Sequence, residues 1–401
     1  MVKNPHFARS GEICGLAHCR QLMNLPELSI EEMAQQQAMR ELLEKEIRAA
    51  GGAIPFDRYM ELALYAPGLG YYVSGAHKFG AGGDFVTAPE ISPYFGYCLG
   101  RQCAQILPSL PLEILEFGAG TGAMAMQILQ ELDRLQPDWE VNYRILEPSP
   151  ELRQRQHECL LDGPPHLLDR VSWVAEVPEG FSGVVLANEV LDAMPVHVFR
   201  RGEKGIEEQW VSREHGRLKL VWRKARGALK RAVKAIEASR GEFAPDYVSE
   251  VNLRLAPWLE MLGQRVDAAV MLFIDYGYTA SEYYHPQRSM GTLICHYRHQ
   301  AHEDVLLRPG LQDITANVDF SAVHQAAVEA GFDLLGFNTQ AGFLLGCGLD
   351  DMLAQSDAED VEAHMAAVQG VKQLVLPDAM GERFKVIALG KNLNMNLRGF
   401  A

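Results

Sequence analysis

The sequence has little of what marks disulfide-stabilised, zinc-binding or membrane-spanning proteins. Its 401 residues include only 7 cysteines, an odd number with no C-x-x-C pair among them. That spacing argues against a disulfide framework and a zinc knuckle, and it favours a reducing compartment. No apolar run reaches the roughly 20 residues that a membrane-spanning helix needs. We also find no internal repeat and no low-complexity tract.

Positive charge is scarce as well. With 52 acidic against 37 basic residues, the formal net charge is −15, which argues against broad nonspecific binding to nucleic acid. The one basic run, residues 223–240, is typical of a solvated helix face, and RNA stays a minor alternative as a substrate. Histidines 296, 299 and 302 follow Cys295, but no carboxylate completes a set of ligands, so no metal site is predicted.

What the chain does have is an ordinary globular composition, 48% hydrophobic and 22% charged. Its length suits one catalytic domain with additions better than several independent domains. Residues 1–28 begin without an organised helix or strand pattern, and they show only weak features of a transit segment. A start of translation at Met23 is a hypothesis that mass spectrometry of the untagged protein would test.

The most informative motif is Glu-Phe-Gly-Ala-Gly-Thr-Gly at residues 116–122, directly after an apolar run. An acidic residue followed by alternate glycines predicts a tight turn from a strand into a helix, where a nucleotide-like ligand can approach the backbone. In an open α/β sheet, Gly118, Gly120 and Gly122 would admit the methionine and ribose portions of S-adenosylmethionine. Glu116 would face the ammonium group or the ribose. Gly118, Gly120 and Ala123 also satisfy the dinucleotide fingerprint, with Glu147 at the end of the next strand, but that fingerprint does not require Glu116.

Strand and helix patterns alternate along the chain, which predicts a doubly wound, Rossmann-like α/β core with a parallel sheet. The patterns predict strands over 112–117, 142–147, 171–174, 183–188, 268–275, 332–339 and 384–389, and helices over 29–50, 121–135, 149–161, 223–262, 320–330 and within 350–369. Extended runs between 196 and 222 predict an inserted antiparallel meander. The expected organisation is a poorly defined segment (1–28), a helical lobe with a glycine-rich loop (29–110), the core (111–195 and 266–401) and the insertion (196–265).

Polar residues follow the strands at the edge where an open α/β sheet binds its ligand. Glu147 ends the second strand and can accept both ribose hydroxyls, although a carboxylate there also suits the start of the next helix. Asn188 and Glu189 end the fourth strand, and Asp192 follows them. If the methyl acceptor is a guanidinium, Glu189 and Asp192 can bind it in a bidentate manner and keep one nitrogen lone pair available. Capping of the following turn is the alternative for Asp192.

Several motifs together carry a family resemblance. They are residues 83–90, 116–122, 188–195, 274–277, 291–293 and 313–320. In this order they resemble the MidA family, which includes the mitochondrial complex I assembly factor with protein arginine methyltransferase activity. The combination is specific, whereas each motif alone is not.

The resemblance implies a class I methyltransferase that uses S-adenosylmethionine, with arginine of a protein as the acceptor and a respiratory-complex subunit as a candidate partner. It also implies that Asp84 and Glu90 close over cofactor or acceptor, and we include Asp84 among the candidate catalytic residues. Asp275 and Tyr276 would line the acceptor side, unless they simply end a strand. We expect Asp313 and Thr315 to cap the helix that approaches residue 320, a structural role that we favour over catalysis.

Ala119, Thr121 and Asn317 differ from the mitochondrial branch of the family, so the chain resembles a bacterial-type member. The expected location is the cytoplasm of a bacterium, or the mitochondrial matrix if the source is eukaryotic. Three alternatives stay open for the function: methylation of RNA, methylation of a small molecule, and assembly of a partner without catalysis. The oligomeric state is open too, and a homodimer is one of its alternatives.

Overall fold

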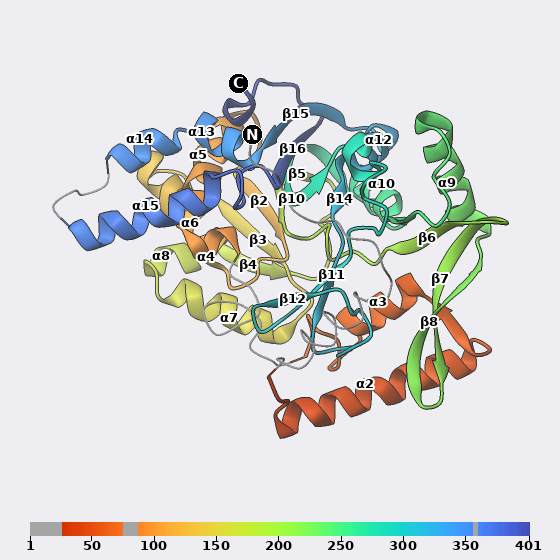
Figure 1. Cartoon of the computed structure of the whole chain (residues 1–401). Helices are drawn as coiled ribbons and strands as arrows, with labels where there is room; N and C mark the ends of the chain where they lie inside the picture. The colour runs from red at the N-terminus through yellow and green to blue at the C-terminus, as the bar shows by residue number, and fades with distance from the viewer. Residues whose placement is uncertain (1–25, 75–86, 356–359) are drawn as a thin grey trace, which may run out of the picture.

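The computed structural model describes residues 26–74, 87–355 and 360–401, and Figure 1 shows their arrangement. The strands are β1 (Ala53–Pro55), β2 (Glu113–Phe117), β3 (Asn142–Leu146), β4 (Val171–Val174), β5 (Phe181–Asn188), β6 (His197–Gly202), β7 (Gly205–Glu214), β8 (Arg217–Lys224), β9 (Val248–Val251), β10 (Val266–Tyr278), β11 (Ile294–Tyr297), β12 (Gln300–His302), β13 (Asp313–Thr315), β14 (Val318–Asp319), β15 (Asp333–Thr339) and β16 (Phe384–Lys391). The helices are α2 (Ile30–Ala49), α3 (Phe56–Tyr65), α4 (Ala88–Ile91), α5 (Tyr94–Ile106), α6 (Ala123–Leu135), α7 (Pro150–Leu161), α8 (Pro165–Leu168), α9 (Gly227–Arg240), α10 (Leu255–Arg265), α11 (Ala280–Tyr283), α12 (Phe320–Glu329), α13 (Gln340–Gly346), α14 (Leu349–Ala354) and α15 (Val361–Val375), with short 3-10 turns at Leu107–Ser109 and Arg398–Phe400.

The main sheet has the strand order β15-β16-β10-β5-β2-β3-β4, and β14 pairs with β10. Strands β10, β5, β2, β3 and β4 run parallel, whereas β16 runs antiparallel between β10 and β15. The chain leaves β2 toward β3 and β4 and then returns to β5 on the other side of β2. The topological switch point therefore lies between β2 and β5, where a sheet of this kind binds its ligand. The predicted doubly wound α/β core is confirmed.

Strand β5 shows why the sheet takes helices on both faces. Val184, Val185, Leu186 and Ala187 are all buried, because successive side chains point to opposite faces and both faces are covered. Val184 and Leu186 pack in a core with α5 and α6, whereas Val185 and Ala187 pack in a second core with α10 and α12. In Figure 1 these helix pairs lie on opposite sides of the sheet.

The predicted meander is present, since β6, β7 and β8 pair in antiparallel order. The prediction of one helical stretch over 223–262 is wrong, because β9 interrupts it between α9 and α10. Helix α9 ends at Gly241, whose φ of 93° departs from helical geometry, and β9 then pairs with β6. A strand of four residues gains its stability from that pairing, which the local pattern does not reveal.

Helices α2 and α3 pack against the meander rather than against the main sheet. Ser29 and Glu32 form a capping box that begins α2 close to its predicted start. Met39, Leu43 and Ile47 of α2 then pack in one core with the meander residue Val211. Helix α5 packs against α6 and the sheet instead. The predicted division into lobe, core and insertion stays a prediction.

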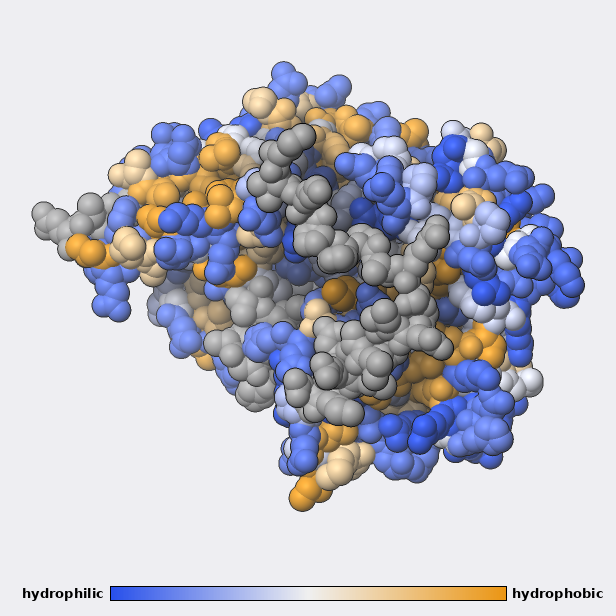
Figure 2. Space-filling view, in the orientation of Figure 1, coloured by the Kyte–Doolittle hydropathy of each residue, from blue (hydrophilic) through white to orange (hydrophobic). Residues whose placement is uncertain are grey.

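The predicted helical excursion near residue 350 appears as α14 and α15, on either side of residues 356–359, which lie outside the described residues. Figure 2 shows hydrophobic surface on this side of the molecule. Val361, Met365 and Leu376 are about half exposed or more. The surface therefore mixes apolar side chains with acidic ones. Within the described residues, no helix is long and apolar enough to cross a membrane, and no group of His, Cys, Asp or Glu is arranged to hold a metal ion.

Candidate functional site

The glycine motif forms the turn between β2 and α6. Gly118, Gly120 and Gly122 have φ values of 61°, 53° and 89°, in the left-handed region where a side chain is strained. A Cβ at Gly122 would lie 3.1 Å from the Cα of Gln156, whereas a Cβ at Gly120 would meet no atom within 4 Å. Gly122 thus allows α7 to pack close to the turn, and Gly120 leaves open space beside the backbone.

Glu147, the carboxylate predicted for the ribose, is tied to this turn by Gln156. The Gln156 side-chain amide donates to Glu147 Oε2 at 3.3 Å and to the Gly120 carbonyl at 3.1 Å. Trp173 holds Gln156 by donating to its Oε1 at 2.7 Å. The Ser149 backbone N–H donates to Glu147 Oε1 at 2.9 Å, so the carboxylate also stabilises the start of α7. Gln156 and Trp173 are site residues that the sequence analysis missed.

Glu116 is more enclosed than the motif suggested. Its side chain is 1% exposed and accepts a hydrogen bond from the Tyr143 hydroxyl at 2.7 Å. Burial raises the pKa of Glu116 to about 8, and the charge of Glu147 adds to that rise, while the Tyr143 hydrogen bond opposes it. The carboxyl is therefore largely protonated at pH 7. Its contact with the cofactor stays a prediction.

Asn188 and Glu189, near the predicted acceptor site, follow β5 at the switch point. Glu189 has φ of 52°, and its backbone N–H donates to the Ile274 carbonyl at 2.9 Å. The Asn188 side-chain amide donates to Glu189 Oε1 at 3.2 Å. Burial raises the pKa of Glu189 to about 8, and the neighbouring charge of Asp192 adds to that rise. A side-chain-bearing residue held at positive φ is a strained position of the kind that functional sites retain.

Asp192 is 4% exposed, and burial raises its pKa to about 6. The turn that carries it is held by Asp275, whose Oδ2 accepts the backbone N–H groups of Leu191 and Asp192 at 3.0 and 3.1 Å. Asp275 Oδ1 accepts the Tyr276 N–H at 2.9 Å. Asp275 is therefore the buried carboxylate that fixes this turn.

Tyrosines from the N-terminal part of the chain complete this cluster. Tyr65 donates to the Ala193 carbonyl at 2.9 Å, and Tyr72 donates to Asp313 Oδ1 at 2.9 Å. The prediction that Asp313 caps the helix near residue 320 is wrong, because Asp319 accepts the first backbone N–H groups of α12 instead. Asp313 lies on β13, which pairs with β11 away from that helix, so its side chain reaches Tyr72.

The loop predicted to close over the site is only partly described. Asp84 lies outside the described residues. Glu90 belongs to α4, where it accepts the Thr87 backbone N–H at 3.1 Å in a capping box. The charge of Glu90 contributes to the raised pKa of Glu189, so the two carboxyl groups lie near each other.

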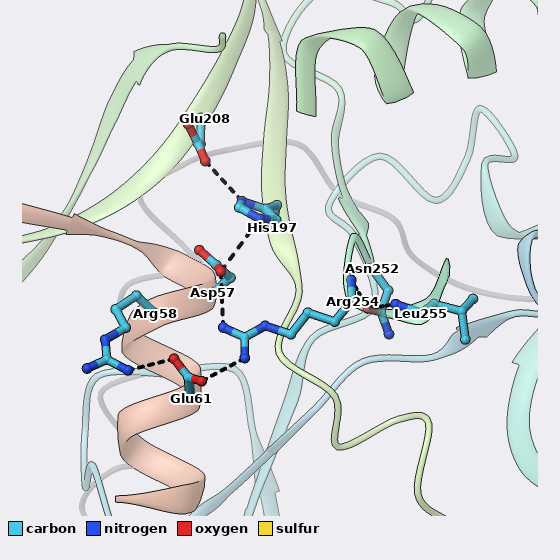
Figure 3. A network of polar contacts seen from close by, with 8 residues as sticks. All are labelled: Asp57, Arg58, Glu61, His197, Glu208, Asn252, Arg254 and Leu255. Carbon is cyan, nitrogen blue, oxygen red and sulfur yellow. Dashed lines mark hydrogen bonds and ion pairs between the residues drawn. The ribbon is translucent and has the colours of Figure 1, made fainter. Parts of the chain in front are cut away.

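A polar network fixes α3 to the rest of the molecule (Figure 3). Arg254 donates to Glu61 at 2.7 Å and to Asp57 at 3.3 Å. His197 lies between Asp57, at 3.6 Å, and Glu208, at 3.0 Å. The bond from Arg254 is the main reason that the pKa of Glu61 falls to about 2. Helix α3 is thus anchored both to the meander and to the segment before α10.

Comparisons with known proteins identify the family of the chain. The family model described as "Putative S-adenosyl-L-methionine-dependent methyltransferase" matches residues 98–338, more than half of the chain. The chain belongs to this family. The predicted MidA-family membership is confirmed, and the protein is an S-adenosylmethionine-dependent methyltransferase.

Relatives of this methyltransferase include mitochondrial proteins and a bacterial crystal structure. The mitochondrial protein arginine methyltransferase NDUFAF7 of Danio rerio is 32% identical, with 85% of this chain and 84% of the relative covered. The Homo sapiens protein of that name is 30% identical, with 84% and 80% covered. A Burkholderia thailandensis protein bound to S-adenosyl-homocysteine has 43% sequence identity and a TM-score of 0.89, with 94% of this chain and 98% of that chain covered.

The site of the methyltransferase fits its cofactor, S-adenosylmethionine. The open side of Gly120 gives a ligand access to the backbone, and Glu147 lies beside it with its carboxylate oriented by Gln156. Gly120 follows β2 at the switch point of the sheet, and Glu147 follows the neighbouring strand β3 at the same edge. The choice of S-adenosylmethionine over a dinucleotide, which the motif alone left open, is confirmed by the family and by the bound product in the bacterial relative.

Proposed function

We propose that this methyltransferase transfers methyl groups to arginine side chains of a protein. The observation that carries the proposal is the pair of enclosed carboxyl groups, Glu189 and Asp192, just after β5 and beside the cofactor strand β2. A guanidinium presents several N–H donors in a fixed plane, and carboxylates match that geometry. The relatives named protein arginine methyltransferases support the same acceptor.

Bound S-adenosylmethionine supplies a methyl group on a positively charged sulfur. In the proposed reaction an arginine Nη would accept that methyl group, the sulfur would leave as a neutral thioether, and the methylated nitrogen would lose one proton. Glu189 and Asp192 would hold the guanidinium so that this nitrogen lies in line with the methyl group. Their negative charge would stabilise the positive charge of the methylated nitrogen. Gly118, Gly120 and Gly122, together with Glu116, Glu147 and Asn188, would bind the cofactor.

The pKa values of the two carboxyl groups suit this role. In the free protein burial raises the pKa values of Glu189 and Asp192, and the charge of Asp192 adds to the rise at Glu189. A guanidinium between them would lower both pKa values, since an opposite charge favours the ionised form. Glu189 could then accept the proton that leaves the nitrogen.

The test is labelling of lysate proteins from cells that lack the gene. Wild-type protein and radiolabelled S-adenosylmethionine should label arginine, identified after acid hydrolysis, and Glu189→Gln should reduce that labelling at least a hundredfold. Glu131→Gln is the control, because Glu131 is a buried carboxylate that pairs with Arg101 and Arg134 instead. Label on RNA, on a small molecule or on another amino acid would contradict the proposal. Wild type that complements a deletion strain but labels nothing would favour assembly without catalysis.

We further propose a protein partner from a respiratory complex, because relatives of this chain are named as mitochondrial. Arginine methylation of respiratory-complex subunits should differ between wild-type and deletion cells in a mass-spectrometric comparison. A bacterial source would place this reaction in the cytoplasm. Sedimentation of the purified protein would test whether it forms a homodimer.

A further inference from the structure

Two tyrosines from the N-terminal part of the chain stand beside the acceptor carboxylates. Tyr65 ends α3, and Tyr72 follows in the next loop. Their rings are stacked, with centroids 5.5 Å apart and planes 23° from parallel. Both side chains are half-buried, and their hydroxyl groups are tied to Ala193 and Asp313. The ring positions are therefore fixed by bonds to both segments that carry the site.

The charges around these rings identify what they face. Asp313 and Asp192 are the charges that most raise the pKa of Tyr65 and of Tyr72, after burial itself. Glu147 contributes to the raised pKa of Tyr65 as well. The charges of the predicted cofactor carboxylate, Glu147, and of the predicted acceptor carboxylate, Asp192, therefore both act on Tyr65. The Tyr65 hydroxyl bonds to the carbonyl of Ala193, the residue after Asp192, so the ring lies beside the turn that carries the acceptor carboxylate.

Asp192 adds an independent sign that a ligand binds here. Its side chain is more than nine-tenths buried, and its Oδ1 has no hydrogen-bond partner within the part of the chain that the structure describes. A buried carboxylate oxygen without a donor is costly, because its desolvation is not compensated. A ligand that brings an N–H donor to Oδ1 would remove this cost.

We propose that Tyr65 and Tyr72 form an aromatic wall of the acceptor site that selects a flat, cationic side chain, with Asp192 Oδ1 accepting one of its N–H groups. This inference rests on the proposed function, because it assigns the determinants of acceptor choice at the same site. A guanidinium is weakly hydrated, stacks on aromatic faces and offers donors in its own plane. The stacked tyrosine rings would supply the aromatic face for such a group, and the unpaired Asp192 Oδ1 would accept its in-plane N–H group.

Two kinds of variant test the tyrosine rings separately from their hydroxyl groups. Tyr65→Phe and Tyr72→Phe keep the aromatic faces, whereas Tyr65→Leu and Tyr72→Leu remove them. Tyr97→Leu is the matched control, since Tyr97 is half-buried and packs edge to face with Tyr94 on α5, in a different core. Each variant should keep its affinity for S-adenosyl-homocysteine within about threefold by calorimetry, if it folds as the wild type does.

The probe is an acetylated and amidated Gly-Gly-Arg-Gly-Gly peptide, with citrulline in place of arginine as its neutral analogue. Ligand-observed NMR with the S-adenosyl-homocysteine complex measures both affinities. We expect the arginine peptide to bind wild type at least tenfold more tightly than the citrulline peptide. The leucine variants should bind it about 5- to 30-fold more weakly, the size of a desolvated cation–π contact. The phenylalanine variants should stay within about threefold of wild type.

Two binding results would overturn the aromatic wall. One is equal binding of the two peptides by wild type. The other is binding of the arginine peptide by the leucine variants Tyr65→Leu and Tyr72→Leu as tightly as by wild type and by the control Tyr97→Leu. Failure of wild type to bind the arginine peptide would overturn it too. Labelling of lysate arginine separates this inference from the proposed function. If arginine is labelled and the leucine variants bind normally, the proposed function stands and the wall does not. If arginine is selected in binding but never labelled, the proposed function fails alone.

Discussion

The sharpest test of the cofactor turn compares two glycines with the same backbone conformation. Gly120 has φ of 53° and Gly227, at the start of α9, has φ of 56°. A Cβ at either position would meet no atom within 4 Å. Alanine at either position therefore has the same strain energy from the left-handed backbone conformation, about 1–2 kcal/mol. The lower entropy of the unfolded chain offsets about 0.4–1 kcal/mol of it. The net loss of unfolding free energy is about 1 kcal/mol for each variant.

This loss is small for a protein of this size. An unfolding entropy of about 2.1 cal/mol/K per residue gives about 0.8 kcal/mol/K for the whole chain, so Tm should fall by about 1 °C in both variants. Only Gly120→Ala places a methyl group where we predict that the cofactor approaches the backbone. Overpacking costs about 1–3 kcal/mol, which weakens binding about 5- to 150-fold.

Calorimetry with S-adenosylmethionine measures this difference, and differential scanning calorimetry gives both Tm values. Gly227→Ala should bind the cofactor as wild type does. If Gly120→Ala also binds as wild type does, the cofactor does not lie against this turn and the reasoning is refuted. A fall in Tm of 5 °C or more for Gly120→Ala alone would show that the backbone strain has been misjudged.

Other predictions follow from the buried carboxyl groups. Acceptor kcat/KM should rise from pH 6 to pH 8 as Asp192 (pKa about 6) and then Glu189 (pKa about 8) ionise, and a pH profile of Glu189→Gln should lack the upper part of that rise. Glu116 has a folded pKa of about 8, above its unfolded value, so its contribution to stability is complete below the unfolded pKa and is lost as pH rises through 8. In chemical denaturation, the free energy of unfolding of Glu116→Gln should therefore fall less between pH 5 and pH 8 than that of wild type. Glu250 is buried and accepts the Thr292 N–H and hydroxyl at 3.0–3.1 Å, so Glu250→Gln should cost about 1–3 kcal/mol in urea unfolding and leave S-adenosyl-homocysteine affinity unchanged.

The sequence predicted the parts of the site that depend on sheet topology. Parallel strands bring their carboxyl ends to one edge, so Glu147 and Glu189 could be placed near the glycine turn from strand order alone. The turn itself was recognisable because positive φ at Gly120 demands glycine or strains any other residue. Local pattern and chain direction are enough for such features.

The parts that could not be predicted join segments far apart in the chain. Gln156 reaches back 36 residues to the Gly120 carbonyl, and Tyr72 reaches 241 residues ahead to Asp313. Neither residue type marks such a contact, because glutamine and tyrosine also occur on ordinary helices and loops. Strand β9 was missed for the same reason, since its stability comes from pairing with β6. These contacts depend on tertiary packing that local periodicity does not encode.

The donors that reach each carboxylate distinguish structural acids from those available to a ligand. A carboxylate can accept about four hydrogen bonds. Asp275 receives three backbone N–H groups, and these hold the turn at Leu191 and Asp192. Among the described residues, Glu189 receives the side-chain amide of Asn188, and Asp192 Oδ1 receives no donor. Removing a charge that already binds three amides should loosen the fold, whereas removing one with an oxygen that has no donor should mainly weaken ligand binding. Asp275→Asn should therefore lower Tm, and Asp192→Asn should instead lower acceptor affinity at nearly unchanged Tm.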